Sequence, residues 1–242
     1  MKRFKSLQYD YDIILIAGQS NAEGRGYDDC KLKYKPNKDI HRMNDRFNAK
    51  IERDFPQNWR DKRARFGSYF GELYVKNCGL QSGRKLLILN CAVGGTGFSD
   101  KRWGMKDPLY LAMMAKISLL LQNPANTFKA FLWHQGETDA QKNMPIDEYQ
   151  SCLDKLVAGV RAEIGCVPFI CGDLVPIWKI KVPYAEKIAE AQRQLVEKIQ
   201  PAGFVESTGL DSNKRPDIIH FNRASQAELG KRYFEIYQQL IK

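Results

Sequence analysis

The stretch that decides the expected fold is Ile13-Ile14-Leu15-Ile16-Ala17-Gly18-Gln19-Ser20-Asn21, near the start of the chain. An unbroken apolar run of this length, without polar alternation, is typical of a parallel strand that is buried on both faces. Gly18 permits a sharp turn directly after the run, and three polar residues follow it. Because ligands of open parallel sheets bind beyond the carboxyl ends of the strands, these polar residues are expected at a functional edge.

The rest of the chain repeats this alternation of short apolar runs and longer segments with helical periodicity. Such alternation is typical of successive βα units. Further strands are predicted over residues 85–90, 129–133, 167–171 and 203–206, and helices over 65–77, 109–121, 146–163, 184–199 and 224–241. The expected fold class is α/β, a three-layer α/β/α sandwich with a central, mostly parallel sheet of five strands.

The last predicted helix carries an apolar stripe. Ala227, Phe234, Tyr237 and Ile241 recur at separations of seven, three and four residues, which places them on one face toward a core. Asn222 precedes the helix and is expected to cap its amino end.

The composition is that of an ordinary globular protein, with 43% apolar and 27% charged residues in a chain of 242. It excludes a collagen, a coiled coil and a disordered chain. No apolar stretch approaches the roughly 20 residues of a membrane helix, so no membrane is expected as a partner. Because polar residues interrupt any signal-peptide core near the start, a cytoplasmic location is favoured, and secretion stays open if a signal was removed.

The formal net charge of +10 favours anionic partners without identifying one. Residues 25–64 are polar and basic and contain Pro36 and Pro56, and they predict a long irregular insert after the first strand. One domain over residues 1–242 is expected, with this insert as a lid, a subunit contact or a surface loop. Basic and acidic residues are interspersed and no nucleic-acid-binding motif occurs, so nucleic acid is not expected as a partner.

Cysteine and histidine spacings give no sign of a metal site. The six cysteines include no C-x-x-C pair, and His41, His134 and His220 lie far apart in the sequence. No metal or organic cofactor is therefore expected. Cys91 and Cys171 each end an apolar run and are interpreted as small buried hydrophobic residues.

Ser20 and His220 are the residues most suited to nucleophilic chemistry. A serine in a turn after a strand is either a nucleophile or a plain turn and helix-cap residue. As a nucleophile it needs a base, and Asp217-Ile218-Ile219-His220 supplies a carboxylate three residues before an imidazole. Taken alone, this pattern is also compatible with an incidental ion pair in a surface turn. His134 ends a predicted strand and is interpreted as a structural histidine.

Donors for a developing oxyanion are available at the same sheet edge. Gly94-Gly95 follows one predicted strand and Gln135 follows another. The glycine pair can present backbone N–H groups without a side chain in the way, or it can be only a tight turn. Gln135 can offer its amide NH₂, or it can be an ordinary polar residue at a strand end.

The ordered set of Gly18-Gln19-Ser20-Asn21, Gly94-Gly95-Thr96, His134-Gln135-Gly136-Glu137 and Asp217-x-x-His220 resembles the SGNH/GDSL hydrolase superfamily. It is most similar to the carbohydrate-esterase branch that contains sialate O-acetylesterases and acetylxylan esterases. The wider superfamily usually has G-D-S and G-x-N-D, where this chain has Gln19 and Gln135, and the branch shows these same substitutions. The resemblance covers nearly the whole chain.

The resemblance implies a flavodoxin-like SGNH hydrolase fold and a serine esterase that removes acetyl groups from sugars without a cofactor. It implies Ser20 as nucleophile, His220 as general base and then acid, and Asp217 as the residue that orients His220. The oxyanion hole would comprise the backbone N–H groups of Ser20 and Gly95, with Gly94 as the alternative to Gly95, and the side chain of Gln135. Supporting roles fall to Gln19, Asn21, Gly94 and Glu137, the last as a brace behind the serine.

The substrate is the least determined part of the prediction. Tyr27, Trp59, Arg60, Arg63 and Trp103 are candidates for a sugar site, although either tryptophan can equally be a core residue. The positive charge suits an acidic sugar such as a sialic acid. Acetylxylan or another short-chain acyl ester, acyl transfer to a sugar hydroxyl, and catalytically silent carbohydrate binding on the same fold stay as alternatives.

Overall fold

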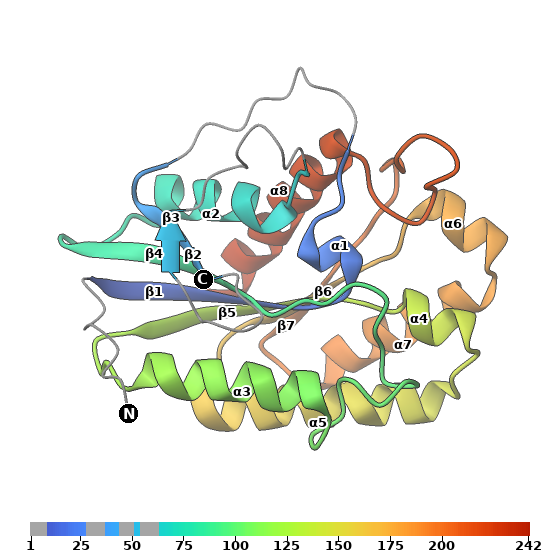
Figure 1. The fold of residues 1–242 in the computed structure, drawn as a ribbon, viewed down its shortest axis with the longest axis horizontal. Helices are drawn as coiled ribbons and strands as arrows, with labels where there is room; N and C mark the ends of the chain where they lie inside the picture. Colours follow the sequence, from blue (N-terminus) through green and yellow to red (C-terminus); the bar gives the residue numbers. More distant parts are fainter. Residues whose placement is uncertain (1–8, 28–36, 44–50, 54–62) are drawn as a thin grey trace.

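A single sheet organises the residues that the computed structural model describes, which are 9–27, 37–43, 51–53 and 63–242. Its strand order is β3-β2-β4-β1-β5-β6-β7 (Figure 1). All neighbours pair in parallel except β2 and β3. The strands are β1 (Asp10–Gly18), β2 (Ile40–Met43), β3 (Ile51–Arg53), β4 (Arg84–Asn90), β5 (Thr127–His134), β6 (Phe169–Gly172) and β7 (Ala202–Val205).

The central strand β1 contains the apolar run with which the sequence analysis began. Every residue of β1 after Asp10 is buried, because β4 and β5 flank the strand and helices cover both faces of the sheet (Figure 1). A strand in this position needs apolar side chains on both faces, which explains why its sequence does not alternate. Its carboxyl end therefore projects Gln19 and Ser20 from a rigid support.

Helices form a layer on each side of the sheet (Figure 1). One layer contains α2 (Phe66–Asn77) and α8 (Arg223–Leu240), which pack against each other. The other contains α3 (Pro108–Leu121), α5 (Ile146–Ile164) and α7 (Tyr184–Lys198). Three short helices, α1 (Ser20–Glu23), α4 (Glu137–Gln141) and α6 (Pro176–Lys181), follow the carboxyl ends of β1, β5 and β6. The predicted three-layer α/β/α sandwich is thus confirmed, and so are its five long helices.

Aromatic side chains fill the core on both sides of the sheet. In the layer of α2 and α8, Phe66 stacks on Tyr233 with ring centroids 4.6 Å apart. On the other side, Trp133 of β5 packs edge-on against Trp103, with ring centroids 5.3 Å apart, and stacks on Phe98 at 5.8 Å. Burial of such large apolar surfaces, at about 25 cal/mol per Å², supplies the main stabilisation of the layers.

The prediction of five strands was wrong, because the sheet has six parallel strands and the antiparallel edge strand β3. Both additional strands, β2 and β3, belong to the insert at residues 25–64, which was expected to be irregular. Each is short, and β2 has the mixed sequence Ile40-His41-Arg42-Met43, so neither shows the apolar run of a buried strand. Residues 28–36, 44–50 and 54–62 of the insert lie outside the described residues.

The last helix follows its prediction except at its end. Phe234 and Tyr237 are buried, Ala227 is half-buried, and Ile241 is 49% exposed because the helix ends one residue before it. Asn222 caps the amino end, where its side chain accepts a hydrogen bond from the backbone N–H three residues later at 2.8 Å. None of the helices in the described part of the chain combines the length and the apolarity that crossing a bilayer requires.

Candidate active site

A tight turn at the end of β1 presents Ser20. Gly18 has a φ of +124°, and a side chain there would overlap the carbonyl oxygen of His134 on β5. Only glycine fits this combination of conformation and close approach. The backbone N–H of Gln19 donates to that same carbonyl at 3.0 Å, which fixes the turn to the neighbouring strand. Ser20 then begins α1 and is 5% exposed.

Ser20, His220 and Asp217 form a hydrogen-bonded series. Ser20 Oγ lies 2.9 Å from His220 Nε2, and His220 Nδ1 lies 2.7 Å from Asp217 Oδ1. A carboxylate accepts but does not donate, so Nδ1 carries the proton and Nε2 is left to accept from the serine hydroxyl. The structure thus brings Ser20 next to a histidine that lies 200 positions later in the sequence and to the aspartate three positions before that histidine.

A small hairpin carries both His220 and Asp217. The backbone N–H of Asn213 donates to His220 O at 2.8 Å, and the N–H of Asn222 donates to Asp211 O at 3.0 Å. The loop between these two pairs contains Asp217. Histidine and aspartate therefore reach Ser20 as one preformed unit rather than as separate side chains.

Asn21 connects this hairpin to the turn that presents Ser20. Its Nδ2 donates to Ile219 O at 3.0 Å, and its Oδ1 accepts from the N–H of Phe221 at 3.1 Å. These two bonds hold the backbone on both sides of His220. Since Asn21 directly follows Ser20, the spacing between Ser20 Oγ and the His220 imidazole depends on one fully buried side chain.

Glu137, the first residue of α4, supports Asn21 from behind. Its Oε1 accepts from Asn21 Nδ2 at 2.6 Å, while its Oε2 has no hydrogen-bond partner among the described residues. Complete burial raises the pKa of the Glu137 carboxyl to about 7, although the bond from Asn21 acts to lower it. The carboxyl contacts neither Ser20 nor His220 by a hydrogen bond, so its place in the structure is that of a support.

Burial lowers the pKa of His220, and the Asp217 carboxylate and its hydrogen bond oppose that shift. The more distant charges of Arg25 and Glu23 lower and raise this pKa respectively. The result is an imidazole that is neutral near pH 7. A neutral imidazole with a free Nε2 lone pair is the form that can take a proton from a serine hydroxyl.

The glycine loop after β4 passes close to Ser20. A Cβ at Gly94 would lie 3.5 Å from Ser20 Cβ, 3.0 Å from Arg25 Nη2 and 3.1 Å from Glu23 Oε2. Gly95 is exposed and has a φ of +70°, a conformation that favours glycine. Within the described part of the chain, the backbone N–H groups of Ser20 and Gly95 donate to no acceptor. Two unused donors therefore border the space beside the serine hydroxyl.

The side chain of Gln135 is buried and already hydrogen-bonded, rather than exposed as a free amide donor. Its side chain has no exposed surface, and its Nε2 lies 2.7 Å from Asp139 Oδ2. The second Nε2–H has only the longer contacts to Gln19 Oε1 at 3.2 Å and to Thr96 O at 3.4 Å. One N–H of this amide is thus committed to Asp139, and the other is held weakly.

Asp139 was not among the predicted site residues. Besides Gln135, its carboxylate accepts from the N–H groups of Phe98 at 3.1 Å and Ser99 at 2.8 Å. It therefore joins α4 to the continuation of the glycine loop. The only signal in the sequence is a second acid two residues after Glu137, and that spacing is too common to identify such a role.

Of the residues predicted as candidates for a sugar site, some lie in the core and others are exposed. Trp103 is completely buried and donates from Nε1 to Thr96 Oγ1 at 2.9 Å, so it supports the glycine loop as a core residue. Tyr27 is 40% exposed, and Arg63 lies 3.9 Å from Glu23. Trp59 and Arg60 lie outside the described residues.

His134 is structural, as interpreted from the sequence. It is completely buried, its Nδ1 lies 3.0 Å from Tyr233 Oη, and burial lowers its pKa to about 3. Cys91 and Cys171 are also buried, in agreement with their interpretation as small hydrophobic residues. In the described residues no group of three or more His, Cys, Asp or Glu side chains has an arrangement that could hold a metal ion.

A parallel sheet whose carboxyl edge carries a serine, a histidine and an aspartate in hydrogen-bonded series is the arrangement of α/β hydrolytic enzymes. Residues 10–239 match the family described as SASA, carbohydrate esterase, sialic acid-specific acetylesterase. This match covers nearly all of the chain, and the chain therefore belongs to this family of carbohydrate esterases. The description of this family names esterases, which are hydrolases that act on ester bonds.

One curated relative is a probable carbohydrate esterase of Arabidopsis thaliana, 27% identical over 154 residues. The match covers 62% of this chain and spans 54% of the length of the relative, or about half. The resemblance to this branch that the sequence motifs indicated is thus supported by an overall match.

Solved structures share the fold. NanS superposes with a TM-score of 0.77 at 18% identity, covering 96% of this chain and 98% of that one. The Arabidopsis thaliana protein gives the same TM-score and coverage at 22% identity. The native aryl esterase of M. smegmatis gives 0.58 at 14% identity, with 95% and 99% covered. At these identities the likeness shows the SGNH-type α/β fold, in agreement with the prediction.

Proposed function

We propose that this chain is a carbohydrate O-acetylesterase that hydrolyses acetyl esters on sugars, similar to sialate O-acetylesterases. The observation that supports the proposal best is the series Ser20 Oγ, His220 Nε2, His220 Nδ1 and Asp217 Oδ1, with spacings of 2.9 and 2.7 Å. Both spacings lie in the range of good hydrogen bonds before any substrate is bound.

In the first half of the proposed reaction, Ser20 Oγ attacks the ester carbonyl while His220 Nε2 takes the hydroxyl proton. The tetrahedral intermediate collapses when the imidazolium returns that proton to the departing sugar oxygen. An acetyl group is then bound to Ser20. Asp217 keeps the imidazole in the correct tautomer and stabilises its charged form.

In the second half, His220 takes a proton from water, which attacks the acetyl carbonyl. The second tetrahedral intermediate expels Ser20 Oγ, which recovers its proton from the imidazolium, and acetic acid leaves and ionises to acetate by releasing a proton to solvent. Each step balances without a metal or an organic cofactor.

The oxyanion of both intermediates would be bound by the unused backbone N–H groups of Ser20 and Gly95. We assign the third donor to the weakly held N–H of Gln135. Catalytic hydrogen bonds often tighten only when substrate is bound, so the longer contacts to Gln19 and Thr96 can be exchanged for one to the oxyanion.

The guanidinium group of Arg25 supports an acidic sugar as the alcohol part of the ester. Its side chain is 33% exposed and reaches the glycine loop beside Ser20. A fixed arginine at the mouth of a site suits a carboxylate, because its planar fork matches carboxylate geometry.

The first test is release of p-nitrophenol from its acetate and from longer acyl esters, with wild type beside Ser20→Ala. We expect wild-type activity that fades with acyl length, and a loss of several orders of magnitude in turnover in the variant. An active Ser20→Ala variant would contradict the mechanism. If the wild-type protein is inert on all esters, acetate release from O-acetylated sialic acids and acetylated xylan fragments decides between esterase and silent binding.

A further inference from the structure

Four of the hydrogen bonds of Asn213 connect it to the surroundings of Ser20, His220 and Asp217. Its side chain is buried, its Nδ2 donates to Asp217 Oδ2 at 2.8 Å and to Arg25 O at 2.8 Å, and its Oδ1 accepts from the N–H of Tyr27 at 3.0 Å. Its backbone N–H donates to His220 O at 2.8 Å. A carboxylate can only accept and an N–H can only donate, so these partners fix which end of the amide faces which way.

The bond to Asp217 occupies the carboxylate oxygen that His220 does not use. The Asp217 side chain is 32% exposed, so the surrounding packing alone leaves it room to rotate. With Oδ1 held by His220 and Oδ2 held by Asn213, the plane of the carboxylate is set at both ends. A carboxylate fixed in this way receives the Nδ1–H of His220 in one geometry.

The Asn213 side chain also reaches the first residues of the insert. It holds the backbone of residues 25 and 27, and the N–H of Arg223 donates to Tyr27 O at 3.0 Å from the other side. The segment held in this way carries the Arg25 side chain, whose Nη2 donates to Glu23 Oε2 at 3.0 Å. Asn213 therefore links Asp217 to the segment that places a cation beside Ser20.

We propose that Asn213 is a positioning residue for ester hydrolysis, which holds Asp217 in the orientation that receives the His220 proton and keeps residues 25–27 against the site. The inference rests on the proposed function, since it presupposes that Ser20, His220 and Asp217 act together. It adds a residue that the Asp217-x-x-His220 pattern does not contain.

A matched structural asparagine allows this role to be separated from simple stabilisation. Asn126 is buried to a similar extent, accepts from the N–H of Tyr11 at 2.9 Å and donates to Leu120 O at 2.8 Å. It lies before β5, at the end of the sheet opposite to Ser20. Asn126→Asp therefore introduces the same charge and loses a similar bond without touching the site.

The experiment compares Asn213→Ala, Asn213→Asp and Asn126→Asp with wild type and Ser20→Ala on p-nitrophenyl acetate between about pH 5 and pH 9. Loss of orientation in Asn213→Ala is expected to lower kcat by roughly 10- to 100-fold with little change in KM. In Asn213→Asp a second carboxylate faces Asp217, so like charges raise the pKa of the pair and of His220, and the acid limb of the profile moves to higher pH. Arg25 and Glu23, the other charges that His220 senses, are unchanged in every variant.

A proton NMR readout tests orientation directly. The Nδ1–H of His220 should give a downfield resonance in wild type and in Asn126→Asp, and this resonance should broaden or vanish in folded Asn213→Ala. If the alanine variant is unstable, Asn213→Asp still carries the test, because it keeps an acceptor for the N–H of Tyr27.

Three results would overturn the inference. One is a wild-type kcat and pH profile in both Asn213 variants, and another is a loss of activity that only follows the folded fraction, as in Asn126→Asp. The third is a loss confined to KM. Equal activity of wild type and Ser20→Ala has a different meaning, since it refutes the proposed function itself.

Discussion

The two ends of the sheet both contain buried polar groups, but they use them differently. At the amino end, Asp12 receives hydrogen bonds from Arg84 Nε at 2.9 Å and from the hydroxyl of Tyr74 at 2.8 Å. Arg84 also donates to Tyr11 O at 2.6 Å and to Ala125 O at 2.7 Å. The bonds at this end stay within the protein and tie strands and loops together.

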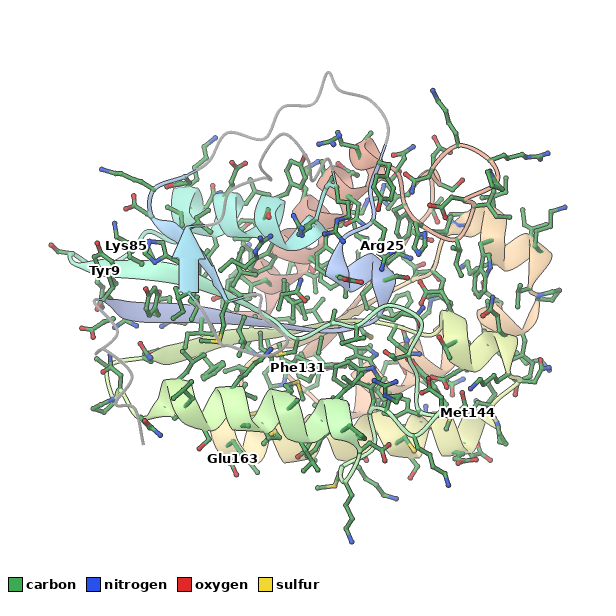
Figure 2. All side chains as sticks on the ribbon, viewed as in Figure 1. Tyr9, Arg25, Lys85, Phe131, Met144 and Glu163 are labelled. Atoms are coloured by element: carbon green, nitrogen blue, oxygen red, sulfur yellow. The ribbon has the colours of Figure 1, made fainter. Side chains whose placement is uncertain are left out.

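At the carboxyl end, donors remain unused beside Ser20. The N–H groups of Ser20 and Gly95 have no acceptor in the described residues, and Glu137 Oε2 is buried without a partner there. Figure 2 shows the two ends, with Tyr9 and Lys85 at one and Arg25 beside α1 at the other. The comparison indicates that buried polar groups stabilise the fold where each has a hydrogen-bond partner within the protein. Where donors are left without a partner, they are available to a ligand.

Among the substitutions that test this comparison, the largest effect is expected from one at the amino end of the sheet. Asp12→Ala leaves the Arg84 charge without its buried partner and should lower the free energy of unfolding by about 3–5 kcal/mol. Urea unfolding measures the loss, and kcat on p-nitrophenyl acetate per folded molecule should not change. Asp10→Ala, two residues earlier and exposed, is the control and should stay within about 0.5 kcal/mol. A fall in kcat as deep as that of Ser20→Ala would erase the distinction between the two ends.

Gln135→Ala tests whether a buried amide at the carboxyl end acts on the substrate. As an oxyanion donor it should lower kcat by about 10² to 10³. Gln192→Ala is the matched control, because Gln192 Nε2 donates to Gln135 O at 2.7 Å and belongs to the same buried network without reaching Ser20. Equal losses of thermal stability with an unchanged kcat in both variants would assign Gln135 to structure alone.

Glu137→Gln tests how the buried carboxyl of Glu137 changes the stability of the protein with pH. Its pKa of about 7 lies above its ordinary value of 4.5, so the folded protein retains a proton that the unfolded chain gives up. Wild-type stability should therefore fall, on the order of 2 kcal/mol, as pH rises from about 4.5 to about 7, whereas Gln at this position removes that fall. The difference in Tm between variant and wild type should grow from pH 5 to pH 8. A difference in Tm that does not depend on pH would contradict the assignment, and Glu235→Gln is the control at an exposed position.

The smallest expected effect concerns Arg25. Its charge lowers the pKa of His220, so Arg25→Gln should raise that pKa and move the acid limb of kcat/KM to higher pH. Glu23 acts in the opposite sense, and Glu23→Gln should move the limb to lower pH. Because the Arg25 side chain is one-third exposed, added salt should reduce both shifts. Shifts of the same sign in the two variants would show that geometry, rather than charge, controls His220.

Periodicity predicted the layers and the five long helices because each depends on local patterns. A strand buried on both faces must be continuously apolar, and a helix against a sheet must repeat its apolar residues every three or four positions. The insert strands β2 and β3 escape such rules, since strands of four and three residues are too short to show a pattern and β3 lies at the edge of the sheet.

The sequence alone determined the central strand and the turn at Gly18, because steric constraints act there on neighbouring residues, and the resemblance of its motifs to a known family made Ser20, Asp217 and His220 the chemical candidates. Tertiary structure alone decided that Trp103 is a core residue, that Gln135 is buried against Asp139, and that Asn213 holds Asp217. These contacts join segments whose spacing carries no periodic signal. An amide or a carboxylate acquires its role from the donor or acceptor that the fold brings to within about 3 Å of it.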